Sequence, residues 1–312
     1  MRPERLPQTR VYRFYRGGAL LDRFRAREEG SDGEFPEDWI GSVTEAKNPG
    51  RDEPGAGLSQ LEDGRLLRDA IAADPVGWLG PAADAGSPGV LVKLLDPAER
   101  LPVHAHPDRA FARAHFDSEF GKTEAWIVLG TRGESGMVWV GQREDTDTAT
   151  YRGWIEAQDT TQLLGTLNEV PVQAGSVVFL PAGVPHAIGA GVLMAELQEP
   201  TDFSIVCEWK GYPIEPADSH LGIGWDAAIQ ALDLRAHTPA TALPDEARAF
   251  FWADERPEPA DRFAVWMVLE GSGSVAGMDV SEGDCLAIPA ALGEIAVDGD
   301  LRVLRCLGPA PR

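Results

Sequence analysis

The sequence is short of lysine, of cysteine and of long apolar runs, and each shortage excludes a class of protein. Its 312 residues hold four lysines against twenty-four arginines, and the excess of Asp and Glu sets the formal net charge at −22. Nucleic acids and anionic membranes bind clustered basic side chains, so neither is expected as a partner. No apolar run approaches the roughly 20 residues that span a bilayer, and the first residues lack the apolar core of a signal peptide. We therefore expect a soluble, cytoplasmic protein.

The three cysteines are odd in number and lack the spacing of a metal site. Cys285 and Cys306 lie in apolar runs and are expected to be buried thiols. Hydrophobic residues make up 43% of the chain, which is ample for buried cores. The length suits one large domain or two of modest size.

Residues 101–130 carry the first specific pattern. Apolar positions in 101–106 alternate with His104 and His106, so a strand here directs both imidazoles to one face. A break and a short helical turn follow, and Glu124 then opens a second apolar strand. Two imidazoles and a carboxylate on neighbouring strands are three quarters of a metal site.

A second pattern supplies the fourth ligand. Residues 175–186 read as a turn glycine, a buried strand, the Pro181-Ala182-Gly183 hairpin and His186 where the next strand begins. A single histidine on an apolar strand is more often a hydrogen-bonded core residue, but four ligand types in one pattern favour a metal site. The two patterns together resemble the motif pair of the cupin barrel, in which three histidines and one glutamate hold a divalent metal. The other three histidines fit no such pattern.

The strand pattern recurs near the C-terminus without the ligands. Residues 264–271 resemble 124–130, and residues 282–290 resemble 174–182. We therefore expect a mainly β protein with two cupin-like (jelly-roll) β-barrels: a metal-binding domain at 1–238 and a metal-free one at 239–312. A small helical insertion is expected at about 145–167, and a strand at 203–209.

These features together resemble one family, the class I (zinc-dependent) mannose-6-phosphate isomerases in their short bacterial form. The most specific pieces are Gly121-Lys122-Thr123-Glu124 and His106-Pro107-Asp108. The likeness runs from about residue 11 to the C-terminus and is densest between 90 and 210. It rests on the segments 92–96, 101–108, 121–126, 181–186 and 195–202.

The resemblance implies a ligand set. His106, Glu124 and His186 stand at the family's metal-ligand positions, and His104 stands where the family often has Gln. One zinc per chain is implied. The extra imidazole favours zinc, manganese, cobalt or iron over magnesium.

The resemblance also implies substrate-binding and catalytic residues. Lys122 matches a lysine of the family's sugar pocket, Lys93 matches another lysine, and Glu196 and Asp202 match acidic positions that line the site. The family normally has an arginine where this chain has Val206. Valine cannot pair with a phosphate, so Lys210 is considered as a substitute cation.

The expected function is a metal-dependent aldose–ketose isomerase that converts mannose 6-phosphate to fructose 6-phosphate through a cis-enediol. Glu196 is the first choice for the base and Asp202 the second, with Lys122 stabilising the enediolate or binding phosphate. Because of Val206, an unphosphorylated or otherwise substituted sugar is the alternative substrate. A non-catalytic sugar-binding cupin and an iron or manganese oxygenase are further alternatives. A monomer or homodimer is expected.

Overall fold

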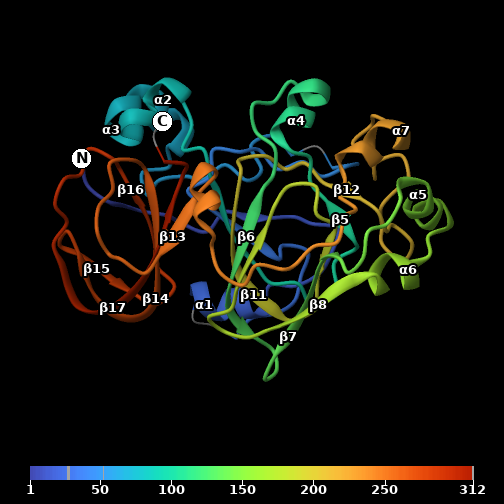
Figure 1. Ribbon diagram of the computed structural model, residues 1–312. Coiled ribbons are helices and arrows are strands. Elements are labelled where there is room, and N and C mark those ends of the chain that lie inside the picture. The colour runs from blue at the N-terminus through green and yellow to red at the C-terminus, as the bar shows by residue number, and fades with distance from the viewer. Residues whose placement is uncertain (27–28, 52, 311–312) are drawn as a thin grey trace.

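The computed structural model of the protein describes residues 1–26, 29–51 and 53–310. The described chain forms three antiparallel sheets with short helices around them, which confirms the mainly β prediction (Figure 1). Its three cysteines are free and buried, as expected for Cys285 and Cys306.

The first sheet, called the central sheet below, has six strands in the order β2-β3-β4-β11-β6-β9. Its middle strands are buried on both faces, because alternate residues pack on opposite sides. Along β6, Trp126 and Val128 enter one apolar cluster while Ala125 and Ile127 contact another. The strands are β2 (Arg10–Val11), β3 (Glu37–Ile40), β4 (Leu91–Leu95), β6 (Glu124–Thr131), β9 (Val177–Leu180) and β11 (Val192–Gln198).

The second sheet, called the histidine sheet, has five strands in the order β12-β5-β10-β7-β8. It faces the central sheet across an apolar cluster that includes Val138, Val140 and Ile188 from one side and Trp126 and Met194 from the other. The two sheets therefore enclose one interior. The strands are β5 (His104–Ala105), β7 (Gly136–Gln142), β8 (Leu167–Val172), β10 (His186–Ile188) and β12 (Ile205–Val206).

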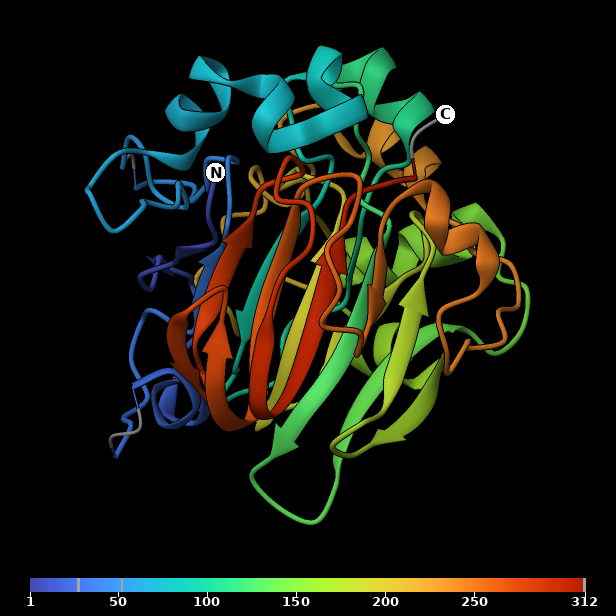
Figure 2. The same ribbon diagram turned by 90° about the vertical axis from the view of Figure 1, so that its left-hand side faces the viewer.

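The third sheet, called the C-terminal sheet, covers the other face of the central sheet (Figure 2). Val265 and Met267 pack toward the central sheet, whereas Trp266 and Val268 enter a separate apolar cluster within the C-terminal sheet. The first strand of the chain, β1 (Glu4–Arg5), pairs with β16 and so belongs here. The other strands are β13 (Trp252–Asp254), β14 (Ala264–Val275), β15 (Met278–Ser281), β16 (Cys285–Ile288) and β17 (Val297–Leu307). That this sheet is a second barrel and a separate domain stays a prediction.

Two helices lie within residues 145–167, where the sequence predicts a helical insertion. Asp147 and Asp159 cap them by accepting hydrogen bonds from backbone N–H groups, and Tyr151 and Leu163 pack with Val103 and Ala187 on the outside of the histidine sheet. No helix of the described ranges is long and apolar enough to cross a membrane. The helices are α1 (Ala19–Ala26), α2 (Leu67–Ala73), α3 (Pro75–Leu79), α4 (Arg109–Phe116), α5 (Thr148–Ala157), α6 (Thr160–Gly165), α7 (Trp225–Ala228) and the 3₁₀ turns η1 (Gly80–Ala85), η2 (Ile229–Ala231) and η3 (Asp245–Ala249).

The strand expected at 203–209 is shorter than predicted, because only Ile205–Val206 pair with β5. Beyond them the backbone N–H groups of Cys207 and Glu208 both donate to the carbonyl of Val103, at 2.8 and 3.1 Å. Two donors on one acceptor end the regular ladder, so the chain turns away from the sheet.

Candidate metal centre

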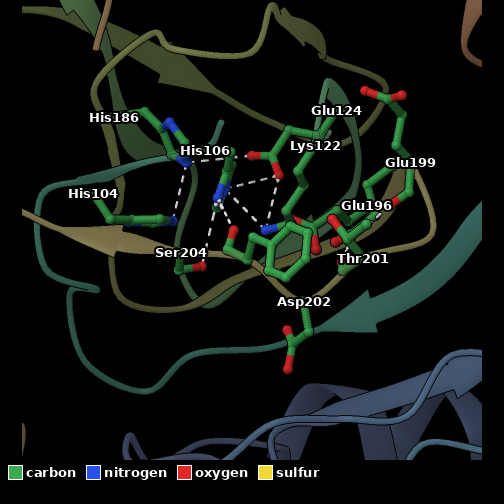
Figure 3. A network of polar contacts seen from close by, with 12 residues as sticks. His104, His106, Lys122, Glu124, His186, Glu196, Glu199, Thr201, Asp202 and Ser204 are labelled. Atoms are coloured by element: carbon green, nitrogen blue, oxygen red, sulfur yellow. Dashed lines mark hydrogen bonds and ion pairs between the residues drawn. The ribbon is translucent and has the colours of Figure 1, made fainter. Parts of the chain in front are cut away.

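The four predicted ligands converge in the interior between the central and histidine sheets (Figure 3). His104 and His186 are directly opposed on β5 and β10, so their side chains leave the histidine sheet on the same face. His106 follows β5, and Glu124 begins β6 on the facing sheet. Each side chain is at most 9% exposed.

The ligand atoms lie close together. Nε2 of His104 is 3.0 Å from Nε2 of His186, and the ligand atoms of the three histidines all lie within 4.8 Å of one another. Glu124 Oε2 is 3.2 Å from Nε2 of His106, and Oε1 is 3.3 Å from Nε2 of His186. Three nitrogens and a carboxylate thus share one small volume.

Backbone carbonyls fix the orientation of all three imidazoles. A carbonyl oxygen can only accept, so each Nδ1 carries the proton and each Nε2 lone pair points into the cluster. Metal-ligating histidines are commonly held in this way. The acceptors are the carbonyls of Pro102 for His104 (2.8 Å), Phe203 for His106 (2.7 Å) and Val184 for His186 (2.8 Å).

The cluster needs a cation to satisfy its acceptors. The Nε2 lone pairs of His104 and His186 face each other. Both carboxylate oxygens of Glu124 are buried and accept no hydrogen bond from the described residues, and Oε2 has an ion pair with Lys122 at 3.3 Å. Such groups are costly to bury unless something accepts their electron pairs. Three imidazole nitrogens and one carboxylate oxygen are the ligands that zinc and similar transition metals take in proteins. The residues therefore fit a divalent metal.

Charge in the cluster follows from burial and from Lys122. Burial lowers the pKa of all three histidines and holds the pKa of His106 at about 3. Burial opposes ionisation of Glu124, but Lys122 and His106 outweigh it and keep the pKa of Glu124 well below its usual value. The ligands are thus neutral imidazoles and an ionised carboxylate, the forms that bind metal.

Lys122 lies against the cluster. Its ammonium is 2.9 Å from Nε2 of His106 and 3.3 Å from Oε2 of Glu124, and the residue is only 5% exposed. Val206 on β12 lies directly across from His104 on β5 in the antiparallel pair, so both side chains leave the histidine sheet on the same face. The position where the resemblance implies an arginine is thus beside the cluster and apolar.

A second buried network adjoins the cluster. Lys93 and Glu196 are opposed on β4 and β11, with the ammonium 3.1 Å from Glu196 Oε2 and 3.9 Å from Glu37 Oε2. Trp126 Nε1 donates to Glu196 Oε1 at 3.2 Å. Burial raises the pKa of Glu196, against the attraction of Lys93. Lys93 is therefore neutralised by two carboxylates.

The remaining predicted residues lie in different surroundings. Both oxygens of Asp202 bind the guanidinium of Arg13, at 2.9 and 3.0 Å, and Oδ2 also accepts the backbone N–H of Lys47 at 2.8 Å. Lys210 is exposed beside a different cavity of about 850 Å³, and no contact within the described ranges joins it to the metal-ligand cluster. The structure thus brings together all predicted residues except Lys210.

The sequence interpretation missed Arg13, Tyr15 and Glu37. Glu37 Oε1 accepts from Tyr15 Oη at 2.6 Å and from Arg13 Nε at 2.9 Å, and Oε2 accepts from Trp39 Nε1 at 2.7 Å. One feature of the sequence, the position of Lys93, could have indicated a buried carboxylate such as Glu37. Lys93 is a single charge in an apolar strand, and a buried lysine requires carboxylate partners.

The fold and the cluster of three histidines and one glutamate define a metal-binding cupin-type protein. No family model matches the chain. A mannose-6-phosphate isomerase of Streptococcus mutans is 28% identical over 242 residues, which are 69% of this chain and 72% of that protein. The solved structure of the mannose 6-phosphate isomerase from Bacillus subtilis has a TM-score of 0.73 at 20% identity, covering 98% of this chain and 99% of that one. A mannose 6-phosphate isomerase bound with zinc and yttrium has a TM-score of 0.70 at 14% identity, covering 99% and 100%.

In sequence and in fold the chain is therefore similar to mannose-6-phosphate isomerases. These similarities agree with the family resemblance that the motifs of the sequence indicate.

Proposed function

We propose that the chain is an aldose–ketose isomerase that interconverts mannose 6-phosphate and fructose 6-phosphate. One zinc ion would be held by His104, His106, Glu124 and His186. The observation that carries the proposal is the convergence of three Nε2 lone pairs and an ionised carboxylate on one buried point, with a lysine beside it. A divalent metal at this point would supply a Lewis acid that polarises the sugar carbonyl.

Glu196 is the proposed base. It takes the proton from C2 of the aldose and returns it to C1, while the hydroxyl proton on O2 passes to O1, so that no hydrogen is gained or lost overall. Burial raises its pKa, which makes its carboxylate a stronger base than an exposed one, and hydrogen bonding from Trp126 together with the pairing to Lys93 orients it. Asp202 is less suited, because the guanidinium of Arg13 already binds both its oxygens.

Lys122 is the proposed partner of the substrate's negative charge. Lys93 is neutralised by Glu196 and Glu37, and Lys210 lies at another cavity, so Lys122 is the cation best placed to act. It can stabilise the enediolate oxygen or bind the phosphate. An ammonium has three N–H donors. His106 and Glu124 lie close enough to take two of them, which leaves one for the substrate.

Val206 supports an unphosphorylated sugar as the second candidate substrate. An arginine at this position would present a guanidinium beside His104, whereas valine offers only apolar surface. A coupled assay with zinc-loaded protein compares mannose 6-phosphate with free mannose. We expect turnover of the phosphosugar; turnover of free mannose alone would contradict the first choice and support the second.

A solvent-exchange experiment tests the base separately. In deuterium oxide the wild type should introduce deuterium at C2 of mannose 6-phosphate, and Glu196→Gln should lose this exchange by about a hundredfold or more. Asp202→Asn is the comparison. If it loses exchange while Glu196→Gln keeps it, the base is wrongly assigned.

We also propose that residues 1–238 form the catalytic unit and that 239–312 form a metal-free structural unit to which β1 contributes a strand. The separate apolar cluster of the C-terminal sheet supports this division. A cytoplasmic location is supported by three buried free thiols, which suit a reducing compartment.

A further inference from the structure

We propose that a cavity at the C-terminal sheet binds the phosphate group of a small phosphorylated metabolite, at a site separate from the metal-ligand cluster. The cavity has a volume of about 320 Å³, and four arginines line it. None of its lining residues belongs to the metal-ligand cluster or to the Lys93 network. This cavity is called the arginine cavity below. Its four arginines are Arg248, Arg256, Arg262 and Arg305.

The charge of the arginine cavity is opposite to that of the whole chain. Its ionisable lining consists of four arginines and the two aspartates Asp254 and Asp261, which gives a local charge of +2. The protein as a whole carries −22. A cavity of this sign in an acidic protein attracts a compact dianion, and guanidinium groups match the geometry of phosphate oxygens.

The two deeper arginines are held in place. Arg305 makes a bidentate pair with Asp254, at 2.9 and 2.8 Å, and Nη1 donates to the carbonyl of Glu258 at 2.9 Å. Arg262 Nη1 donates to Asp261 at 2.9 Å, while its buried Nε has no hydrogen-bond partner among the described residues. A buried donor that lacks an acceptor is costly, and an oxygen of a bound anion would satisfy it.

The two outer arginines are the less neutralised pair. No hydrogen bond or ion pair of the Arg256 side chain occurs within the part of the chain that the structure describes, and this residue is exposed. Arg248 stacks over the ring of Trp252 at 3.5 Å, and its nearest carboxylate is that of the exposed Asp245 at 3.7 Å. Stacking uses the face of a guanidinium and leaves its edge donors available.

The size and apolar wall of the cavity favour an organic phosphate over a free one. Small-molecule sites range from about 300 to 1,000 Å³, so this one suits a compact ligand. Trp252, Ala260 and Leu307 also line the cavity and offer apolar surface to an organic group. The arginines would bind the phosphate and the apolar wall would contact the rest of the metabolite.

Calorimetric titration of the zinc-loaded protein with glycerol 3-phosphate and with inorganic phosphate tests the proposal. Arg248→Gln/Arg256→Gln removes the two outer charges without disturbing the paired deeper arginines. Arg65→Gln/Arg68→Gln is the matched control, since both residues are exposed, paired with acids and remote in sequence. Lys122→Ala removes the cation of the metal site, so that binding there can be distinguished.

We expect glycerol 3-phosphate to bind the wild type, the control and Lys122→Ala alike, and to bind Arg248→Gln/Arg256→Gln about tenfold or more weakly. Isomerase turnover of Arg248→Gln/Arg256→Gln should equal that of the wild type, which also verifies its fold. The proposed site is overturned if Arg248→Gln/Arg256→Gln binds glycerol 3-phosphate as tightly as the wild type, or if Lys122→Ala no longer binds it. Inorganic phosphate that binds as tightly as glycerol 3-phosphate overturns its assignment to an organic phosphate.

Discussion

At the scale of single residues, His104 is the predicted ligand that distinguishes this chain from the pattern implied by the family resemblance. It is fixed by the carbonyl of Pro102 and lies opposite His186, so its place depends on strand register. An imidazole nitrogen binds zinc more strongly than an amide oxygen does. The side chain therefore contributes to the choice of metal more than to the fold.

We predict that His104→Gln keeps a folded, metal-binding protein with weaker zinc affinity, by about tenfold or more. Glu124→Gln should lose zinc almost completely, because it removes the only negative charge among the ligands. Chelator competition on both variants measures the affinities. Equal zinc affinity in His104→Gln and the wild type would remove His104 from the ligand set.

Glu37 is the residue whose ionisation affects stability most clearly. Burial opposes its charge, but Arg13 and Lys93 outweigh burial and lower its pKa from 4.5 to about 2. Because the pKa of Glu37 is lower in the folded than in the unfolded protein, its ionised carboxylate stabilises the fold fully above the unfolded-state pKa. This stabilisation is lost as the pH falls toward 2. The window for this contribution is therefore between about pH 4.5 and 2.

We predict that Glu37→Gln lowers the free energy of unfolding by about 3 kcal/mol at pH 7. The difference from the wild type should shrink as pH falls through the window and vanish near pH 2. Urea denaturation at several pH values measures it. A difference that does not change with pH would mean that the charge of Glu37 is not the stabilising feature.

At the scale of elements, α4 is connected to the metal site through Arg109. Its guanidinium pairs with the fully buried Glu199 and donates to the carbonyl of Ala249 at 3.1 Å. Glu199 in turn accepts the backbone N–H of Thr123 at 3.0 Å. Because Thr123 lies between Lys122 and Glu124, this chain of contacts positions two residues of the site.

We predict that Arg109→Ala lowers kcat/KM and zinc affinity by about tenfold to a hundredfold, as is typical when a group that orients a ligand is removed. Arg109→Lys should recover part of both. The matched control is Arg113→Ala on the same helix, whose exposed pair with Glu119 contributes little. Equal losses in Arg109→Ala and Arg113→Ala would contradict a positioning role.

The elements also show what the sequence could and could not predict. Alternation within 101–106 and the hairpin before His186 are local patterns, so the candidate ligands can be predicted from them. The pairing of Arg13 with Asp202 joins residues 189 positions apart, and no local pattern indicates it. The arginine cavity likewise draws its lining from the separate segments 248–262 and 305–307. Lys210 is close to Val206 in sequence but lies at another cavity, because nearness in sequence does not determine nearness in space.

At the scale of the whole molecule, three sheets in layers create the environment of the site. The C-terminal sheet covers one face of the central sheet, and the histidine sheet closes the other. The interior between the central and histidine sheets excludes water from Glu124, Glu196 and Lys93, each at most 3% exposed. Electrostatic interactions are stronger there than at the surface, which suits the stabilisation of a developing charge.

The central claim is that the buried cluster of three imidazoles and Glu124 holds a divalent ion on which isomerisation depends. The most direct measurement is turnover of mannose 6-phosphate by protein stripped with a chelator and then titrated with zinc. We predict that activity disappears on stripping and returns in full with one equivalent of zinc per chain. Full activity in the verified metal-free protein would contradict the account.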